Sequence, residues 1–240
     1  MKIRAVIFDI YNTLLEVGPP PSDAEAQWEK LCREAFAGTP CPSLRAFNRT
    51  CDEVIAREHA SARATGIQWP EVYWPDVLTA ALPELAKFPA NALAGFALRH
   101  ARLTRTVRMM PGAKEGLNRL RDLNIPLGLA SNAQPYTLAE LEGVMDQGCT
   151  LAIFRPALKF FSFEHGFSKP DPHVFRLLAT RLRTLAIAPG ETLMVGDRVD
   201  RDIEPARAQG FQTWHLGSPA DVPGGDWRAL NARLPKPGLV

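Results

Sequence analysis

The stretch of sequence that decides the fold is IRAVIFDIYNT, residues 3–13. Residues 3–8 are largely apolar with little alternation, which predicts a strand covered on both faces, as in a parallel sheet. The run stops at a carboxylate, Asp9, and a phenol, Tyr11, stands two residues later. The Gly-Pro-Pro-Pro sequence at 18–21 continues neither helix nor strand, so we expect the chain to leave this first unit there.

The composition is that of a globular protein. The chain has 240 residues, of which 46% are hydrophobic and 22% charged, enough to bury a full core. Its 28 basic and 26 acidic residues give a net charge of +2 without a basic block, so no nucleic acid partner is expected. No apolar run approaches the roughly 20 residues of a membrane span. Because the chain opens on a strand pattern instead of a charged leader, we predict a cytoplasmic protein without a membrane partner; its oligomeric state is left open.

A helical segment follows the prolines. Apolar residues recur at helical spacing, and helix starts and stops divide the segment into four predicted helices, over 22–38, 43–63, 71–85 and 89–105. The segment shows no strand pattern, which predicts a small helical bundle inserted into the fold. We therefore divide the chain into a core domain of residues 1–17 and 109–240 and an inserted helical domain of residues 18–108.

Strands and helices alternate after the insertion. The patterns predict strands at 125–130, 158–161, 192–195 and 211–216, separated by helices at 113–123, 136–146, 173–185 and 204–209, with a last helix after Gly225. Such alternation is typical of a parallel sheet with helices on both faces. The predicted fold class is therefore α/β, with a doubly wound parallel sheet and an inserted α-helical domain.

Polar residues follow three of the predicted strands. Asp9, Ser131 and Asp197 each come at a strand's carboxyl end, where ligands bind in folds of this type. Lys169 stands before a proline, and Asp202 lies five residues beyond Asp197. Each residue taken alone has an ordinary explanation as a turn, a helix cap or a solvated charge. Their order and their placement at strand ends together predict one polar site.

These residues resemble the motifs of the haloacid dehalogenase-like (HAD) hydrolase superfamily. Asp9 with Thr13 looks like the first motif, Ser131 the second and Lys169 the third, while Asp197 with Asp202 resembles the fourth. The resemblance spans the whole chain. It implies a Rossmann-like core, and the helical insertion resembles the cap that closes over the site in this superfamily.

The resemblance implies roles for the site residues. Asp9 would be the nucleophile that forms a covalent aspartyl intermediate. Mg²⁺ prefers oxygen ligands, and Asp9, the backbone carbonyl of Tyr11 and Asp197 would supply them, with Asp202 as an outer partner.

Three further residues would act on the transferring group. Ser131 and Lys169 would hold it and stabilise its charge, and Asn132 would help to orient it. The implied partner is a small phosphorylated metabolite.

Tyr11 departs from the pattern of the superfamily's phosphatases. They usually carry Asp at this place, where it protonates the leaving oxygen and then activates water, whereas a phenol with a pKa near 10 is a poor base at neutral pH. The Asp-x-Tyr-x-Thr pattern resembles the 2-haloacid dehalogenases instead, but these lack metal-type carboxylates such as Asp197 and Asp202. Three functions stay open: a Mg²⁺-dependent phosphatase, a metal-independent 2-haloacid dehalogenase-like hydrolase, and a phosphate-binding protein with little turnover.

The helical insertion contains candidate substrate contacts. His59 and Arg63 stand at i and i+4 on one predicted helix face, and Glu71 follows shortly after. His59 is suited to proton transfer near neutral pH. We predict that these three residues contact the substrate.

Overall fold

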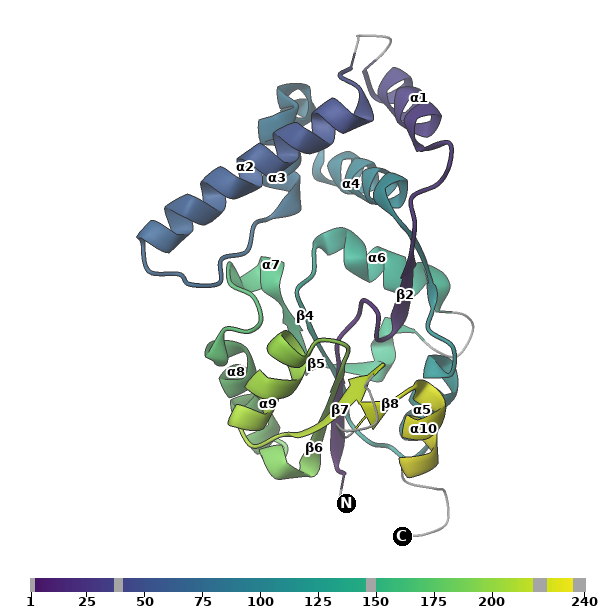
Figure 1. Ribbon diagram of the computed structural model, residues 1–240, viewed down its shortest axis with the longest axis vertical. Helices are drawn as coiled ribbons and strands as arrows, with labels where there is room; N and C mark the ends of the chain where they lie inside the picture. The colour runs from purple at the N-terminus through teal and green to yellow at the C-terminus, as the bar shows by residue number, and fades with distance from the viewer. Residues whose placement is uncertain (1–2, 37–40, 146–149, 218–223, 235–240) are drawn as a thin grey trace.

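A six-stranded sheet forms the centre of the core (Figure 1). The computed structural model describes residues 3–36, 41–145, 150–217 and 224–234. All strand pairs in this sheet are parallel. Their order across the sheet is β5 (Phe154–Phe161), β4 (Leu127–Ser131), β1 (Ala5–Phe8), β6 (Thr192–Gly196), β7 (Gln212–Leu216) and β8 (Gly224–Gly225). The predicted doubly wound α/β fold is confirmed. The strand pattern missed β8, because two glycines form no apolar run.

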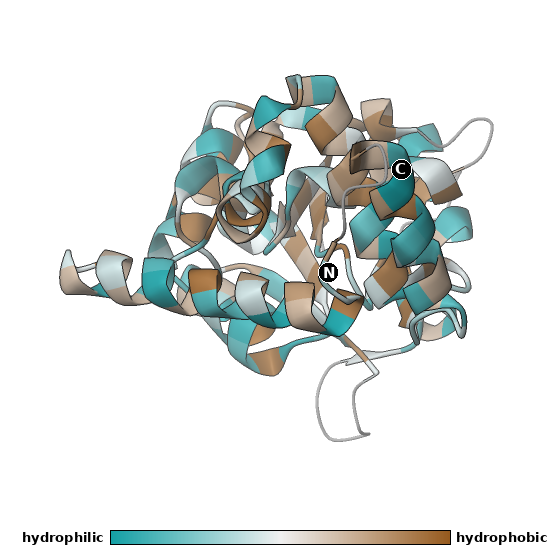
Figure 2. Ribbon diagram, turned by 90° about the horizontal axis from the view of Figure 1, so that it is seen from above, coloured by the Kyte–Doolittle hydropathy of each residue, from teal (hydrophilic) through white to brown (hydrophobic). Residues whose placement is uncertain are grey.

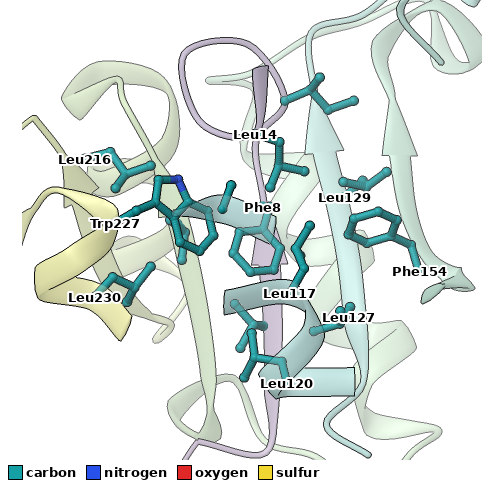
Figure 3. Close-up of a cluster of buried hydrophobic side chains, with 14 of the residues drawn as sticks. Phe8, Leu14, Leu117, Leu120, Leu127, Leu129, Phe154, Leu216, Trp227 and Leu230 are labelled. Carbon is teal, nitrogen blue, oxygen red and sulfur yellow. The ribbon is translucent and has the colours of Figure 1, made fainter. Parts of the chain in front are cut away.

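Strand β1 lies in the middle and is buried on both faces. Successive side chains of a strand point to opposite faces, so Val6 and Phe8 belong to one apolar cluster and Ala5 and Ile7 to the other. Figure 3 shows Phe8 in the first cluster, stacked on Trp227 with ring centroids 5.6 Å apart. This double coverage explains why residues 3–8 show so little alternation.

Helices cover both faces of the sheet (Figure 1). The first cluster receives side chains from α5 (Ala113–Asp122), α6 (Pro135–Val144) and α10 (Trp227–Arg233). The second receives them from α8 (Pro172–Arg183) and α9 (Glu204–Ala208). Several short elements were not predicted: α7 (Ser162–His165), η2 (Leu151–Ile153), η3 (Pro189–Glu191) and η4 (Val199–Ile203).

The inserted segment has a hydrophobic cluster of its own. Trp28, Phe47, Leu78 and Phe96 are buried in it, and Trp28 stacks on Phe47 at 4.8 Å between ring centroids. Figure 2 shows hydrophilic and hydrophobic residues interleaved along the outer helices, as expected where only one face of a helix is buried. The helices are α1 (Ala24–Phe36), α2 (Leu44–Ala64), α3 (Trp74–Ala81), η1 (Pro83–Lys87) and α4 (Ala90–Thr104).

The third helix, predicted over 71–85 with an interruption or shift at Pro75 and Pro83, is shorter than these limits and is broken at Pro83. The structure has α3 only over Trp74–Ala81, and the separate turn η1 begins at Pro83. Proline lacks the N–H that would continue the helical hydrogen bonds, so the helix ends before it. The predicted helix ends at Gly38 and Asp146 lie outside the described residues.

Two strands that were not predicted join the insertion to the core. β2 (Leu15–Gly18) and β3 (Thr106–Met109) pair in antiparallel fashion, and Arg108 donates hydrogen bonds of 2.8 and 2.7 Å to both oxygens of Glu16. Each strand has four residues, too few for a periodic pattern. The domain limits expected from the sequence fall inside this pair. Among the described residues, every helix is either too short or too polar to span a lipid bilayer.

His100 makes the stability of the insertion sensitive to pH. The side chain is buried against Trp28, Phe47 and Trp74, and its Nε2 lies 2.8 Å from Asn48 Oδ1. Burial, with a smaller contribution from Arg105, lowers the pKa of His100 to about 4 from its ordinary 6.5. The unfolded chain therefore binds the proton more readily, so stability is lost as the pH falls from 6.5 to 4.

We expect this single group to remove about 3 kcal/mol of unfolding free energy between pH 7 and pH 4. The measurement is urea unfolding of the wild type and of His100→Gln at both pH values. The loss should be smaller in the variant by about that amount. An equal loss in both proteins would show that other groups control the acid sensitivity.

Candidate active site

Three neighbouring strands deliver polar residues to one edge of the sheet. Asp9 directly follows β1, Ser131 ends β4, and Asp197 directly follows β6. β1 lies between β4 and β6, so the three residues meet at the carboxyl ends of adjacent strands. The backbone N–H of Asp9 donates to the carbonyl of Val195 at 2.9 Å, which fixes Asp9 against β6. The predicted convergence of these residues is present in the structure.

Lys169 reaches the same place from the loop between α7 and α8. Its Nζ lies 2.8 Å from Asp9 Oδ1 and also contacts Asp202 Oδ1. The side chain is only 3% exposed. Burial by itself lowers the pKa of a lysine, but the carboxylates of Asp202 and Asp9 raise it overall, so Lys169 stays charged.

Asn132 holds Lys169 in position. Its side-chain Nδ2 donates to the Lys169 carbonyl at 2.9 Å, and its Oδ1 accepts from the Lys169 N–H at 2.7 Å. Both ends of the amide are thus engaged by one backbone unit. The structure gives Asn132 a positioning role, and its predicted contact with substrate stays a prediction.

Asp9, Asp197 and Asp202 form a carboxylate cluster. One oxygen of each lies within 4.8 Å of the others. Asp202 is buried and accepts a hydrogen bond of 3.1 Å from the Arg198 N–H. Gly196 allows this approach, because a Cβ there would lie 2.5 Å from the Cβ of Asp202.

Burial and mutual repulsion shape the electrostatics of the cluster. Burial and then the charge of Asp9 raise the pKa of Asp197, against a hydrogen bond from the Asn12 side chain. Burial also raises the pKa of Asp202, and the ammonium of Lys169 opposes that rise. Since Lys169 contacts Asp9 and Asp202, Asp197 is the carboxylate of the three without an ion pair among the described residues.

The cluster fits a divalent cation. Three ionised carboxylates and one lysine leave two negative charges, and the repulsion between Asp9 and Asp197 is what a bound cation would relieve. Carboxylate oxygens are also the ligands that Mg²⁺ prefers. The ion would be held by Asp9, Asp197 and the Tyr11 carbonyl. Asp202 would lie outside these direct ligands as an outer partner.

The hydroxyl of Tyr11 is engaged by other side chains of the protein and is not free to transfer a proton to substrate. The hydroxyl donates to Glu140 Oε2 at 2.5 Å, accepts from Arg105 Nη2 at 2.7 Å, and lies 3.0 Å from Thr137 Oγ1. A phenol has one proton and two lone pairs, so these three partners use its full capacity. Burial, the largest effect, raises the pKa of Tyr11 far above its ordinary value despite the nearby Arg105. Tyr11 therefore stays neutral.

Arg105, which is half-buried, and the buried Glu140 form an ion pair beside Tyr11. Arg105 follows the last residue of α4, and its Nη2 lies 2.9 Å from Glu140 Oε2 on α6. The guanidinium carbon sits 4.8 Å from the centre of the Tyr11 ring and 5.3 Å from that of Tyr136, in cation–π range. Sequence reasoning missed these residues, because no local pattern links positions so far apart.

Glu71 joins the helical insertion to the core. Its Oε1 accepts from Gln134 Nε2 at 3.1 Å and its Oε2 from Ser162 Oγ at 2.7 Å. Gln134 also accepts from the Trp74 N–H at 2.8 Å and donates to the Val72 carbonyl at 2.9 Å. Both carboxylate oxygens of Glu71 are therefore engaged by Gln134, in the loop after β4, and by Ser162, the first residue of α7.

The remaining predicted residues have fewer contacts. His59 is half-buried and Arg63 exposed on α2, whose C-terminal end lies to the left of α7 in Figure 1. In the part of the chain that the structure describes, no hydrogen bond or ion pair joins either side chain to the carboxylate cluster. Thr13 is fully buried, and its carbonyl accepts from Trp227 Nε1 at 2.8 Å. The roles predicted for these three residues stay predictions.

Comparison with known proteins gives consistent matches. The family model of the haloacid dehalogenase-like hydrolases matches residues 3–210. The glyceraldehyde 3-phosphate phosphatase of Pyrococcus furiosus is 27% identical over 220 residues, covering 88% of this chain and 80% of the relative.

Solved structures share the fold. A 2-haloacid dehalogenase from Pseudomonas syringae pv. tomato superposes with a TM-score of 0.58 at 18% identity, covering 96% of this chain and 97% of that one. A HAD phosphatase from Thermococcus onnurineus superposes with a TM-score of 0.54 at 18% identity and the same coverage. With the family model matched over most of its length, this chain belongs to the haloacid dehalogenase-like hydrolase family.

Proposed function

We propose that this hydrolase removes the phosphoryl group from a small phosphorylated metabolite in a Mg²⁺-dependent reaction. The observation that carries the proposal is the cluster of Asp9, Asp197 and Asp202 around Lys169, because its two uncompensated negative charges suit a divalent cation. The phosphatase names of sequence relatives support it.

The reaction would proceed in two displacements at phosphorus. A carboxylate oxygen of Asp9 forms a bond to phosphorus while the bond to the leaving oxygen breaks. Water then attacks phosphorus while the bond between phosphorus and the Asp9 oxygen breaks, and the water gives up a proton to solvent, which yields inorganic phosphate and regenerates the Asp9 carboxylate. Bound Mg²⁺ would supply positive charge that lets two anions approach each other. Lys169 stabilises charge on the transferring group, and Ser131 binds its oxygens.

The leaving oxygen still needs a proton. Tyr11 has no free proton to give, because Glu140, Arg105 and Thr137 occupy its hydroxyl. We infer that the enzyme favours substrates whose leaving group departs without strong acid assistance. General acid catalysis contributes roughly 10²- to 10⁴-fold, so alkyl phosphates should react slowly.

Tyr11→Asp tests this inference. A carboxyl group at position 11 would restore the acid and base that the family's phosphatases usually have. We expect kcat for an alkyl phosphate to rise by roughly 10²-fold, the lower end of the range for general acid catalysis. Phosphate release at pH 7 is the measurement, and Tyr11→Phe is the control. A similar rise in Tyr11→Phe would assign the effect to loosening of the site.

We further propose that residues 18–108 act as a cap domain over a core of residues 1–17 and 109–240. The separate hydrophobic cluster of the insertion and the two-stranded connection through β2 and β3 support this division. His59 and Arg63 would then contact substrate only if α2 moves toward the strand ends. Glu71 would fix the position of the cap on the core through its hydrogen bonds with Gln134 and Ser162.

The direct experiment is a hydrolysis screen with and without metal. Phosphorylated metabolites and 2-haloacids are incubated with the protein in Mg²⁺ or in EDTA, and phosphate and halide release are measured. We expect phosphate release that requires Mg²⁺ and is lost with EDTA. Vanadate binding that shows no dependence on Mg²⁺ or Asp197 would contradict the proposal.

The presence of Tyr11 is also compatible with a second function, that of a metal-independent dehalogenase. Halide leaves carbon without protonation, so a metal-independent dehalogenase needs no acid at this position. Halide release that resists EDTA in the same screen would establish that alternative. Tight binding of phosphate mimics with no turnover, even in Tyr11→Asp, would instead indicate a phosphate-binding protein.

A further inference from the structure

The side chain of Tyr11 connects the loop after the nucleophile with the inserted segment. Tyr11 lies two residues after Asp9 and shortly before β2, the first of the two paired strands that join the core to the insertion. Arg105 directly precedes β3, the second of these strands, and its Nη2 donates to the Tyr11 hydroxyl at 2.7 Å. One hydrogen bond therefore joins the active-site loop to the end of the insertion.

Helix α6 holds the same hydroxyl from the core. α6 contacts both α4 and β3 and lies next to α4 in Figure 1. The Tyr11 hydroxyl donates to Glu140 Oε2 of this helix at 2.5 Å, and Arg105 Nη2 donates to the same oxygen at 2.9 Å. The phenol, the guanidinium and the carboxylate thus form a closed triangle of hydrogen bonds, in which each group fixes the other two.

A second route from the insertion ends at this hydroxyl. The Trp74 N–H donates to the Gln134 side chain at 2.8 Å, and the Gln134 N–H donates to Thr137 Oγ1 at 3.0 Å. Thr137 Oγ1 in turn lies 3.0 Å from the Tyr11 hydroxyl. The insertion therefore reaches Tyr11 both directly, through Arg105, and through the start of α6.

Stability alone is a weak reason for an ion pair at this place. The side chains of Arg105 and Glu140 are 20% and 1% exposed. Removing two charges from water costs about as much as their attraction returns, and apolar side chains of the same volume often stabilise a protein equally well. What the pair does provide is one fixed position for Tyr11, whose ring centre lies 4.8 Å from the guanidinium carbon.

The backbone carbonyl of Tyr11 shares its Cα with this anchored side chain. The next peptide N–H, that of Asn12, donates to the Leu15 carbonyl at 2.6 Å. Since a peptide unit is planar, this bond and the anchored side chain together restrict the direction of the Tyr11 carbonyl. Groups that orient a metal ligand in this way commonly decide how tightly the metal binds.

We propose that Arg105 and Glu140 are positioning residues that hold Tyr11 and thereby orient its carbonyl as a ligand of the divalent cation. The inference rests on the proposed function for the metal site itself. Because Arg105 belongs to the end of the insertion, the placement of the insertion on the core is linked to the metal affinity of the active site. Neither residue takes part in the displacement at phosphorus.

Metal binding tests the inference without relying on turnover. The probe is Mn²⁺, which takes oxygen ligands as Mg²⁺ does and whose free form is measured by electron paramagnetic resonance. Arg105→Met should raise the Kd for Mn²⁺ by about 10- to 100-fold, the usual effect of losing a group that orients a metal ligand. Arg105→Lys, which keeps a positive charge and a donor, should raise the Kd less.

Tyr11→Phe tests the link from the other side. The substitution removes only the hydroxyl and leaves Arg105 paired with Glu140, so it remains informative if Arg105→Met does not fold. It should raise the Kd for Mn²⁺ by about tenfold. Adding Arg105→Met to Tyr11→Phe should then change the Kd by no more than about twofold, because both substitutions act through the same hydroxyl, whereas independent effects would multiply.

Controls separate this positioning role from a role in stability. Arg102→Met removes an exposed arginine from the same helix and should leave the Kd unchanged. Urea unfolding without metal shows which variants are folded. Equal Kd values in the wild type, Arg105→Met and Tyr11→Phe would overturn the inference and leave the proposed function standing. Mn²⁺ binding that is the same in the wild type and in Asp197→Asn would overturn the proposed function, and this inference with it.

Discussion

Asp9→Asn is expected to reduce kcat for phosphate release on the order of 10⁴-fold or more. Asparagine has nearly the shape of aspartate but lacks the negative charge that attacks phosphorus, and loss of a covalent nucleophile is among the largest effects in enzyme kinetics. The fold should survive, because Lys169 keeps its contact with Asp202 and the Asp9 backbone keeps its bond to Val195.

The measurement is single-turnover phosphate release with the best substrate from the screen, together with urea unfolding. Asp122→Asn is the matched control, since Asp122 is an exposed carboxylate at the end of α5. The control should keep its kcat within twofold. If Asp9→Asn retained a tenth of wild-type activity, Asp9 would not be the nucleophile.

Lys169→Met is expected to lose both stability and activity. The substitution leaves Asp9 and Asp202 without their shared cation, and Asp202 is only 1% exposed. Removing one partner of a buried ion pair typically costs 3–5 kcal/mol, so we expect the unfolding free energy to fall by about 4 kcal/mol in the absence of metal. Loss of charge stabilisation should lower kcat by about 10²- to 10³-fold.

The stability loss should depend on pH and metal. Without Lys169, burial raises the pKa of Asp202 above its unfolded value, so the folded variant binds the proton more readily. The difference from wild type should therefore shrink as the pH falls through that raised pKa. Mg²⁺ should also reduce the difference, because it binds the folded carboxylates.

A double variant provides the decisive check. Lys169→Met with Asp202→Asn removes one uncompensated charge and should recover more than half of the lost stability, whereas two independent effects would add. Lys87→Met on the exposed surface should stay within about 0.5 kcal/mol of wild type. Additive losses in the double variant would mean that Lys169 stabilises the fold through packing alone.

The sequence predicted the parts of the site that follow from local patterns. An apolar run fixes a strand, and the residue after it lies at the carboxyl edge of the sheet, so local periodicity was enough to place Asp9, Ser131 and Asp197. The helical insertion was predicted for the same reason, since each of its longer helices carries its own apolar stripe. Strands β2, β3 and β8 were missed because two to four residues are too few to show a period.

By itself, then, the sequence determined the sheet, its helices and the edge where the carboxylates meet, because these depend on periodicity within short windows. Only the tertiary structure decided what the side chains at that edge do. Tyr11 is bound by Arg105, Thr137 and Glu140, which lie 94, 126 and 129 residues away along the chain. Such contacts form only when distant segments pack together, and they make Tyr11 a neutral residue whose hydroxyl is fully used.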